Sequence, residues 1–221
     1  MAELTDEEFF LPLFPLPNLV FFPQTRLPLH VFEPRYRQLL ADAVASDQRL
    51  GIVLLKPGWE ADYYGAPPIH LCGTVGHIEQ AVPLDDGRFN VLLRGDVRFR
   101  IVDETSRDPY RKARVQVQPQ QTQEGEKSYL QRTWLADLSS QYLKYLPQPG
   151  SVPEIQTAGL EALTNALIMS LNLDNEEKQR LLEQDDLLQR AADVGRELEI
   201  RIESLRFLAP FRGASGDPTR N

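Results

Sequence analysis

Short apolar runs separated by proline, glycine and polar turns dominate the first 120 residues. These runs predict strands over residues 10–14, 27–32, 50–55, 72–81, 89–93, 97–102 and 111–117. In the last run Ala113, Val115 and Val117 alternate with polar residues, which predicts one buried and one solvent-facing side. Several short strands joined by tight turns, with few helices between them, favour a barrel or a sandwich over a parallel sheet.

Prolines and glycines refine this strand pattern. Pro12 and Pro28 interrupt the first two runs, and because proline lacks an N–H these runs are expected at sheet edges or strand ends. Residues 84–87 end in Asp-Gly, which has the chemistry of a hairpin turn because glycine tolerates positive φ. The Arg-Gly-Asp sequence at residues 94–96 is expected to make the next tight connection.

One helix is predicted inside the strand region, over residues 34–44. Pro34 suits the first helical position. An apolar stripe at helical spacing follows, formed by Tyr36, Leu39, Leu40, Ala43 and Val44.

Leucines at helical spacing mark the second half of the chain. They predict helices around residues 130–142, 160–171, from 174 onward and 186–208. Leu130, Trp134, Leu138 and Tyr142 are expected to share one face of the first. Asp174 is expected to cap the third helix and Pro210 to end the last. The expected organisation is therefore a β-barrel over residues 1–120, a helical bundle over 121–210 and a disordered tail over 211–221.

Composition narrows the class of protein. The 221 residues carry 24 Lys and Arg against 32 Asp and Glu, and the net charge of −8 argues against a dedicated DNA-binding protein. A single cysteine excludes an internal disulfide and a multi-cysteine zinc site. The acidic N-terminus does not look like a secretory signal, and no apolar stretch is long enough to span a membrane. We therefore expect a soluble, cytoplasmic protein with no membrane partner.

Five segments of the chain stand out by their order and spacing: residues 11–23, 29–37, 72–76, 87–101 and 179–183. Together they resemble the N-terminal, substrate-binding domain of Lon proteases. Residues 11–23 resemble the opening of that domain, and residues 29–37 look like its next segment in the form common among stand-alone bacterial members. Residues 72–76 and 87–101 resemble its paired strands, and residues 179–183 a helix of its helical part. The resemblance covers roughly residues 9–208 and implies an α+β fold: a small PUA-like β-barrel with one inserted helix, followed by an α-helical bundle.

The chain differs from a full-length Lon protease in what it lacks. A phosphate-binding loop needs spaced glycines before Gly-Lys-Ser/Thr, and the nearest approach, residues 125–128, has the wrong spacing. The chain ends at Asn221, too early for a Ser–Lys peptidase module. We therefore expect no ATPase, no peptidase and no other enzyme activity, and no cofactor.

The aromatic residues of the segment 57–68 are the candidate binding residues. Trp59, Tyr63 and Tyr64 lie among glycines and prolines, and aromatic side chains in irregular surface loops are common at recognition sites. We expect them to border, together with Phe21 and Phe22, an apolar groove that holds extended polypeptide. The alternative is that these rings fold back and cover one end of the barrel.

Two other clusters contain residues capable of chemistry. The first is the family motif around the predicted helix start, which comprises His30, Glu33, Pro34, Arg35 and Tyr36. An acid–base role is conceivable there, but Glu33 beside free helix N–H groups and an arginine paired with a carboxylate are expected to be structural. The second cluster, His70, Cys72 and His77, has the wrong strand parity for three metal ligands, so a buried cysteine and no metal are expected.

Between residues 88 and 114 lie eight basic residues, seven of them arginine. Because PUA-like barrels include RNA binders, this segment is the best argument for RNA binding, but six acidic residues lie in or beside it. The leading hypothesis is a non-catalytic module that binds unfolded polypeptide or a protein partner, in an adaptor or chaperone-like role. The alternative hypothesis is an RNA-binding barrel, although the negative net charge makes nucleic acid an unfavoured partner. We expect the protein to be a monomer or a weak dimer.

Overall fold

The structure is a computed structural model that describes residues 8–120, 125–145 and 157–212, with side chains to residue 208. The chain divides into two compact units. One comprises Met1–Gln121 and Leu171–Asp185, and the other comprises Thr122–Ser170 and Asp186–Asn221. Because the described residues end at 212, most of the expected C-terminal tail, residues 211–221, lies outside them. No helix in the described ranges combines the length and apolar content needed to cross a membrane.

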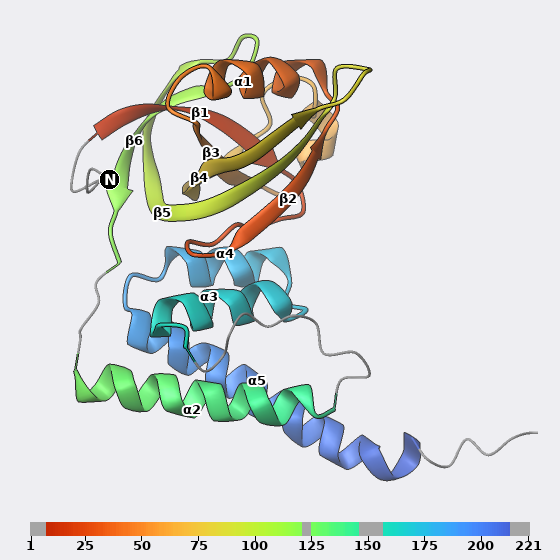
Figure 1. Cartoon of the computed structure of the whole chain (residues 1–221), viewed down its shortest axis with the longest axis vertical. Helices are drawn as coiled ribbons and strands as arrows, with labels where there is room; N and C mark the ends of the chain where they lie inside the picture. The colour runs from red at the N-terminus through yellow and green to blue at the C-terminus, as the bar shows by residue number, and fades with distance from the viewer. Residues whose placement is uncertain (1–7, 121–124, 146–156, 213–221) are drawn as a thin grey trace, which may run out of the picture. The chain divides into compact units, whose positions relative to one another are not determined.

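Six strands and one helix build the first unit (Figure 1). The strands are β1 (Glu8–Leu16), β2 (Arg26–Val31), β3 (Arg49–Leu55), β4 (Ile69–Pro83), β5 (Phe89–Ser106) and β6 (Lys112–Gln118). Their order is β2-β5-β4-β3-β1-β6, and an additional pairing between β5 and β6 closes the sheet into a ring. Only β1 and β3 pair in parallel. The expected α+β fold, a small barrel with an inserted helix and then helices, is confirmed.

The tight connection expected at residues 94–96 is wrong, because the two flanking runs form the single strand β5. The pairing of β4 with β5 shifts register between Thr74 and Gly76, which marks an irregularity opposite this segment. The Gly95 N–H donates a hydrogen bond of 2.9 Å to the Thr25 carbonyl. A Cβ atom at Gly95 would lie 2.2 Å from the Phe22 carbonyl oxygen. This glycine therefore allows a close approach of two backbones and does not turn the chain.

The prolines of β1 also behave differently from the expectation. β1 lies between β3 and β6 in the closed ring and is not an edge strand. Its residues 8–12 pair with β6 and its residues 13–16 with β3, so each half leaves one side largely unpaired. A missing N–H is tolerated on such a side. Pro28 follows the expectation, because β2 ends the strand order and pairs with β5.

Helix α1 (Pro34–Val44) packs its apolar face into the barrel core. The predicted stripe is buried except for Val44, which is 41% exposed. Phe21 and Phe22, which precede β2, are 1% and 0% exposed. Burying a phenylalanine side chain stabilises a fold by roughly 1.5–3 kcal/mol. These two rings therefore belong to the interior of the first unit.

The first unit also contains α4 (Asn175–Glu183), a helix that the sequence pattern assigned to the bundle. Asp174 caps it as expected, since its Oδ1 accepts a 2.7 Å hydrogen bond from the Glu177 N–H. At the other end Arg98, 2% exposed, donates a hydrogen bond of 2.9 Å from Nη1 to the Leu182 carbonyl. A guanidinium at this position satisfies a terminal carbonyl and favours the negative end of the helix dipole.

The second unit contains α2 (Glu126–Leu143), α3 (Leu160–Ser170) and α5 (Leu187–Arg212). The face expected on α2 is only partly correct, because Leu138 is buried but Leu130 is 58% exposed. Inside the unit the fully buried Arg190 donates a hydrogen bond of 3.1 Å to the Asn165 side chain. The prediction that Pro210 ends the last helix is wrong, because α5 continues to Arg212.

Candidate functional site

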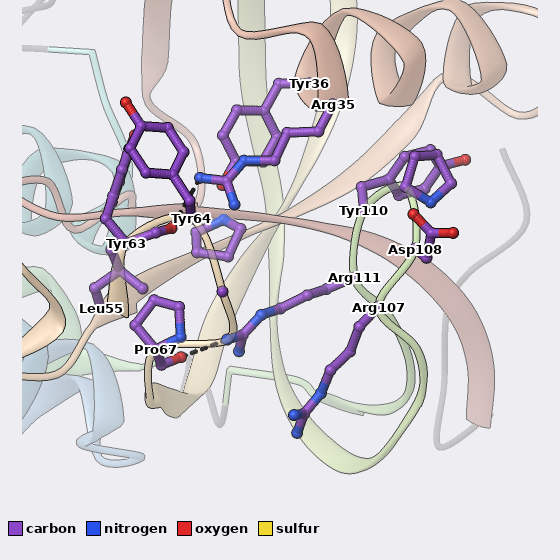
Figure 2. A pocket seen from close by; sticks show the side chains of 13 residues that line it. Arg35, Tyr36, Leu55, Tyr63, Tyr64, Pro67, Arg107, Asp108, Tyr110 and Arg111 are labelled. Atoms are coloured by element: carbon purple, nitrogen blue, oxygen red, sulfur yellow. Dashed lines mark hydrogen bonds between the residues drawn. The ribbon is translucent and has the colours of Figure 1, made fainter. Parts of the chain in front are cut away.

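A cavity of about 160 Å³ lies within the first unit (Figure 2). Four segments line it: β1, the first turn of α1, residues 55–67 and the connection 107–111 between β5 and β6. Ligand pockets for drug-sized molecules are typically about 300–1,000 Å³. This cavity therefore suits a single side chain or a chain end better than a cofactor.

The aromatic segment expected from the sequence forms one border of this cavity. The short 3₁₀ helix η1 (Trp59–Asp62) places the Trp59 and Tyr63 rings edge to face, with 5.3 Å between their centroids. Both rings are half-buried and pack against the barrel core. The Tyr64 ring stands edge-on to Tyr63 at 5.2 Å and is 87% exposed. Two of the three rings thus cover the barrel, and the third is free to meet a ligand.

Glu33 and Arg35 hold this aromatic segment against the start of α1. The Tyr63 hydroxyl donates a hydrogen bond to Glu33 Oε1. The Arg35 Nε donates one of 3.1 Å to Glu33 Oε2, and its Nη2 donates one of 3.2 Å to the Tyr63 carbonyl. Burial, followed by the hydrogen bond to Glu33, raises the pKa of the Tyr63 hydroxyl. Glu33 occupies the N-cap position of α1, but its side chain accepts no hydrogen bond from the helix N–H groups. Its carboxylate instead contacts Tyr63 of the aromatic segment and Arg35.

Arg35 and Arg111 bring two positive charges to the cavity. The Arg35 guanidinium lies over the Tyr36 ring, 4.6 Å from its centroid. Tyr36 is 6% exposed, and burial raises its pKa to about 12. Arg111 is 7% exposed and donates a hydrogen bond to the Pro67 carbonyl. Burial lowers the pKa of Arg111. Figure 2 shows both arginines extending toward the segment that carries Tyr63 and Pro67.

The sequence pattern did not single out Arg111 or Tyr110 as site residues. Arg111 opened a predicted strand with the same parity as the buried Ala113, Val115 and Val117, but we did not read this parity as a sign of a buried arginine. The pairing of β6 with β1 and β5 places it beside the segment 55–67. The alternation is a local signal that this side chain is buried, but its neighbours in the cavity depend on pairing between distant parts of the chain.

Phe21 and Phe22 were expected to border the polypeptide-binding groove, and the structure contradicts this. Both side chains are buried in the barrel and have no surface available for a ligand. Thr74 donates a hydrogen bond of 2.6 Å to the Phe21 carbonyl, which ties this segment to β4. An apolar Phe-Phe pair beside proline is as typical of a buried connection as of a binding surface, so the sequence pattern alone did not separate the two.

The other candidate residues do not contribute a reactive side chain to the cavity. His30 Nδ1 lies 2.8 Å from Asn90 Oδ1, and His30 is not among the residues that line the cavity. Pro34 occupies the first turn of α1. Cys72 is buried, and burial raises its pKa to about 11, which opposes thiolate chemistry. Among the described residues no group of His, Cys, Asp or Glu side chains is arranged to hold a metal ion.

Most of the basic residues between 88 and 114 are paired with carboxylates. Six of the eight form ion pairs: Arg88, Arg94, Arg98, Arg107, Arg111 and Arg114. Partners include Asp86, which lies 2.5 Å from Arg88, and Asp103, which lies 2.8 Å from Arg114. Such pairing leaves a mixed surface and not a continuous basic stripe.

Comparisons with known proteins agree with this fold. Residues 10–199 match the model of a family described as the ATP-dependent protease La (LON) substrate-binding domain. Lon protease 2 of Myxococcus xanthus is 33% identical over 204 residues, and a Lon protease of Cytophaga hutchinsonii is 28% identical over 199 residues. These alignments cover 89% and 86% of this chain but 24% of each relative, so the chain spans about a quarter of their length.

Solved structures give the same result. The crystal structure of a Lon N-terminal domain protein from Xanthomonas campestris is 25% identical, with a TM-score of 0.62, covering 84% of this chain and 96% of that one. The N-terminal domain of a Mycobacterium avium complex Lon protease is 19% identical with a TM-score of 0.60, and it covers 88% of this chain and 98% of that one. Fold, family model and relatives converge, and the chain belongs to the family of Lon substrate-binding domains.

Proposed function

We propose that this chain is a non-catalytic module that binds unfolded or extended polypeptide, in an adaptor or chaperone-like role. The observation that carries the proposal is the Tyr64 ring, 87% exposed at the border of a cavity lined by other tyrosines and by arginines. Exposed aromatic rings beside a concave surface supply area and a polar tip, the usual features of a binding hot spot. The family description, a substrate-binding domain, supports the same function.

The proposed binding is modest in strength. Apolar burial contributes roughly 25 cal/mol per Å², and ordering an extended chain offsets much of it. One free ring and a small cavity therefore predict micromolar affinity at best for a single segment, with several weak segments adding up in a long unfolded chain. Weak, repeated binding suits an adaptor or a chaperone that must release its client.

Nothing in the described residues favours catalysis over binding. The buried Cys72 lacks thiolate character, and the Glu33 carboxylate is engaged by Arg35 and Tyr63. The RNA alternative also has little support, because most arginines between residues 88 and 114 are neutralised by neighbouring carboxylates. A phosphate backbone needs such cations unpaired.

Fluorescence anisotropy tests the proposal. The probe is a fluorescein-labelled extended peptide rich in leucine and phenylalanine, titrated with the whole chain. Tyr64→Ala is expected to weaken binding by about tenfold, which corresponds to the loss of one aromatic hot spot. Tyr129→Ala, which removes a ring that is 66% exposed on α2, is the matched control and should leave binding unchanged. Equal binding by both variants would contradict the proposed surface.

A further inference from the structure

The Arg111 side chain is a buried cation whose ion pair with a carboxylate is long and shared with a second arginine. It is 7% exposed, and its hydrogen bond goes to the neutral carbonyl of Pro67. The nearest carboxylate, Glu104, lies 3.7 Å from Nη1, and Arg107 approaches the same carboxylate at 3.3 Å. Buried charges are normally paired, because transfer of an unpaired charge out of water is costly. Glu104 therefore balances the charge of Arg111 only in part, because it lies closer to Arg107.

Arg35 adds a second cation to the same cavity. Its charge is balanced by Glu33, which lies 3.1 Å away. Asp108 also lines the cavity, but Figure 2 shows its carboxylate turned away from the guanidinium groups of Arg35 and Arg111. Planar guanidinium groups are the preferred protein partners of carboxylates, since both can form paired hydrogen bonds.

The Tyr36 hydroxyl adds a neutral hydrogen-bond donor. Tyr36 lines the cavity with its ring buried, and no partner for its hydroxyl occurs within the part of the chain that the structure describes. Burial raises its pKa to about 12, so the hydroxyl keeps its proton at neutral pH and can donate. A negatively charged group in the cavity would accept a hydrogen bond from the Tyr36 hydroxyl and form an ion pair with Arg111.

We propose that this cavity is a carboxylate site, in which Arg35, Tyr36 and Arg111 hold one carboxylate of the bound polypeptide while Tyr64 contacts the apolar residues beside it. The inference rests on the proposed polypeptide binding and specifies its chemistry. The carboxylate comes either from the C-terminus of the client or from an Asp or Glu side chain. The cavity volume of about 160 Å³ admits a group of this size and excludes a folded domain.

A set of labelled peptides with one common apolar sequence distinguishes these sources. One peptide has a free C-terminal carboxylate, a second is amidated there, and a third is amidated but carries an internal glutamate. The site predicts that the amidated peptide without glutamate binds at least about tenfold more weakly than one of the two acidic peptides, since hydrogen bonds to charged groups are stronger than those between neutral groups. The acidic peptide that binds more tightly identifies the source.

Two variants place the effect in this cavity. Tyr36→Phe removes only the hydroxyl, and Arg35→Gln removes one charge; each should reduce the preference for the acidic peptide. Arg49→Gln is the matched control, because Arg49 also pairs with an acidic residue two positions before it, at 2.8 Å, and also lies over an aromatic ring. Its side chain is 27% exposed, against 22% for Arg35. Thermal melts establish that each variant is folded.

Each outcome bears on the inference. Equal affinity for all three peptides, with Tyr64→Ala still weakening them, would overturn the carboxylate site and leave the proposed function standing. A preference that survives in both Tyr36→Phe and Arg35→Gln would also overturn it. If no peptide binds, the proposed function fails, and an NMR titration with sodium succinate decides the site independently: shifts at Arg35 and Arg111 that Tyr36→Phe weakens support it, and their absence overturns it.

Discussion

The Tyr63 hydroxyl donates a hydrogen bond to the Glu33 carboxylate across 30 positions of sequence. Glu33 lies at the start of α1 and Tyr63 in the aromatic segment, so this contact joins the two parts of the sequence singled out for different reasons. Arg35 reinforces it by contacting both residues. The residues of the family motif thus position the aromatic segment that we propose to bind polypeptide.

Removal of this contact should loosen the aromatic segment. In Tyr63→Phe the Glu33 carboxylate keeps Arg35 but loses the phenol, at a cost of about 1–2 kcal/mol because the acceptor is charged and half-buried. Hydrogen exchange of residues 58–66 should therefore accelerate while exchange in β3 and β4 stays slow. Tyr129→Phe provides the control. Unchanged exchange in the 58–66 segment would show that the contact does not hold it.

Buried and exposed aromatic residues of the first unit should differ clearly in their effect on the free energy of unfolding. Phe22→Ala removes a fully buried ring and is expected to cost about 3–5 kcal/mol in the free energy of unfolding by urea. Tyr64→Ala removes an exposed ring and is expected to change it by less than about 0.5 kcal/mol. Similar losses in both variants would mean that Tyr64 is part of the core and not free for a ligand.

Alkaline pH should destabilise the first unit through Tyr36. Burial raises its pKa to about 12 in the folded state, from the ordinary value of 10.0, so between these values the unfolded chain releases a proton that the folded chain retains. Stability therefore falls as the pH rises through this window, by roughly 2–3 kcal/mol from this residue. Urea unfolding as a function of pH should show the fall, and Tyr36→Phe should reduce its slope. An identical slope in the variant would refute the role of Tyr36.

Removal of the contact between Arg98 and α4 should destabilise α4 and the neighbouring strand together. In Arg98→Met the Leu182 carbonyl loses its donor, and Asp185, 3.0 Å from Nη2, loses its partner. The expected cost is about 2–4 kcal/mol, since the arginine is buried at its hydrogen-bonding end. Hydrogen exchange should rise across residues 175–183 together with neighbouring β4. Faster exchange in α5 alone would place α4 with the bundle, as its sequence pattern suggested.

Local periodicity predicted where most of the strands and helices lie, but not all of their ends and not their partners. Alternation of Ala113, Val115 and Val117 with polar residues marks β6, because a strand with one dry side must alternate. The role of Gly95 was misjudged because a turn and a close backbone approach both need glycine. The prolines of β1 were misplaced because the rule against central prolines assumes that a strand is paired along its full length.

The candidate site was predictable only in part, for a similar reason. Trp59, Tyr63 and Tyr64 are adjacent in sequence, so their association in one segment was visible. Arg111 reaches the same cavity through pairing between β6, β1 and β5, and no local pattern records that. Phe21 and Phe22 show the converse error, since apolar rings in a connection can point inward as readily as outward.

Site-specific photo-crosslinking can show whether polypeptide binds at the aromatic border of the cavity. A photoreactive p-benzoyl-phenylalanine introduced at position 64, with a second variant at position 129, is irradiated in the presence of the labelled extended peptide. Both positions carry exposed tyrosines, so the replacement should leave the fold intact. We expect strong crosslinking at position 64 and little at position 129. Crosslinking at position 129 alone, or at neither position while the peptide binds, would contradict binding at this border.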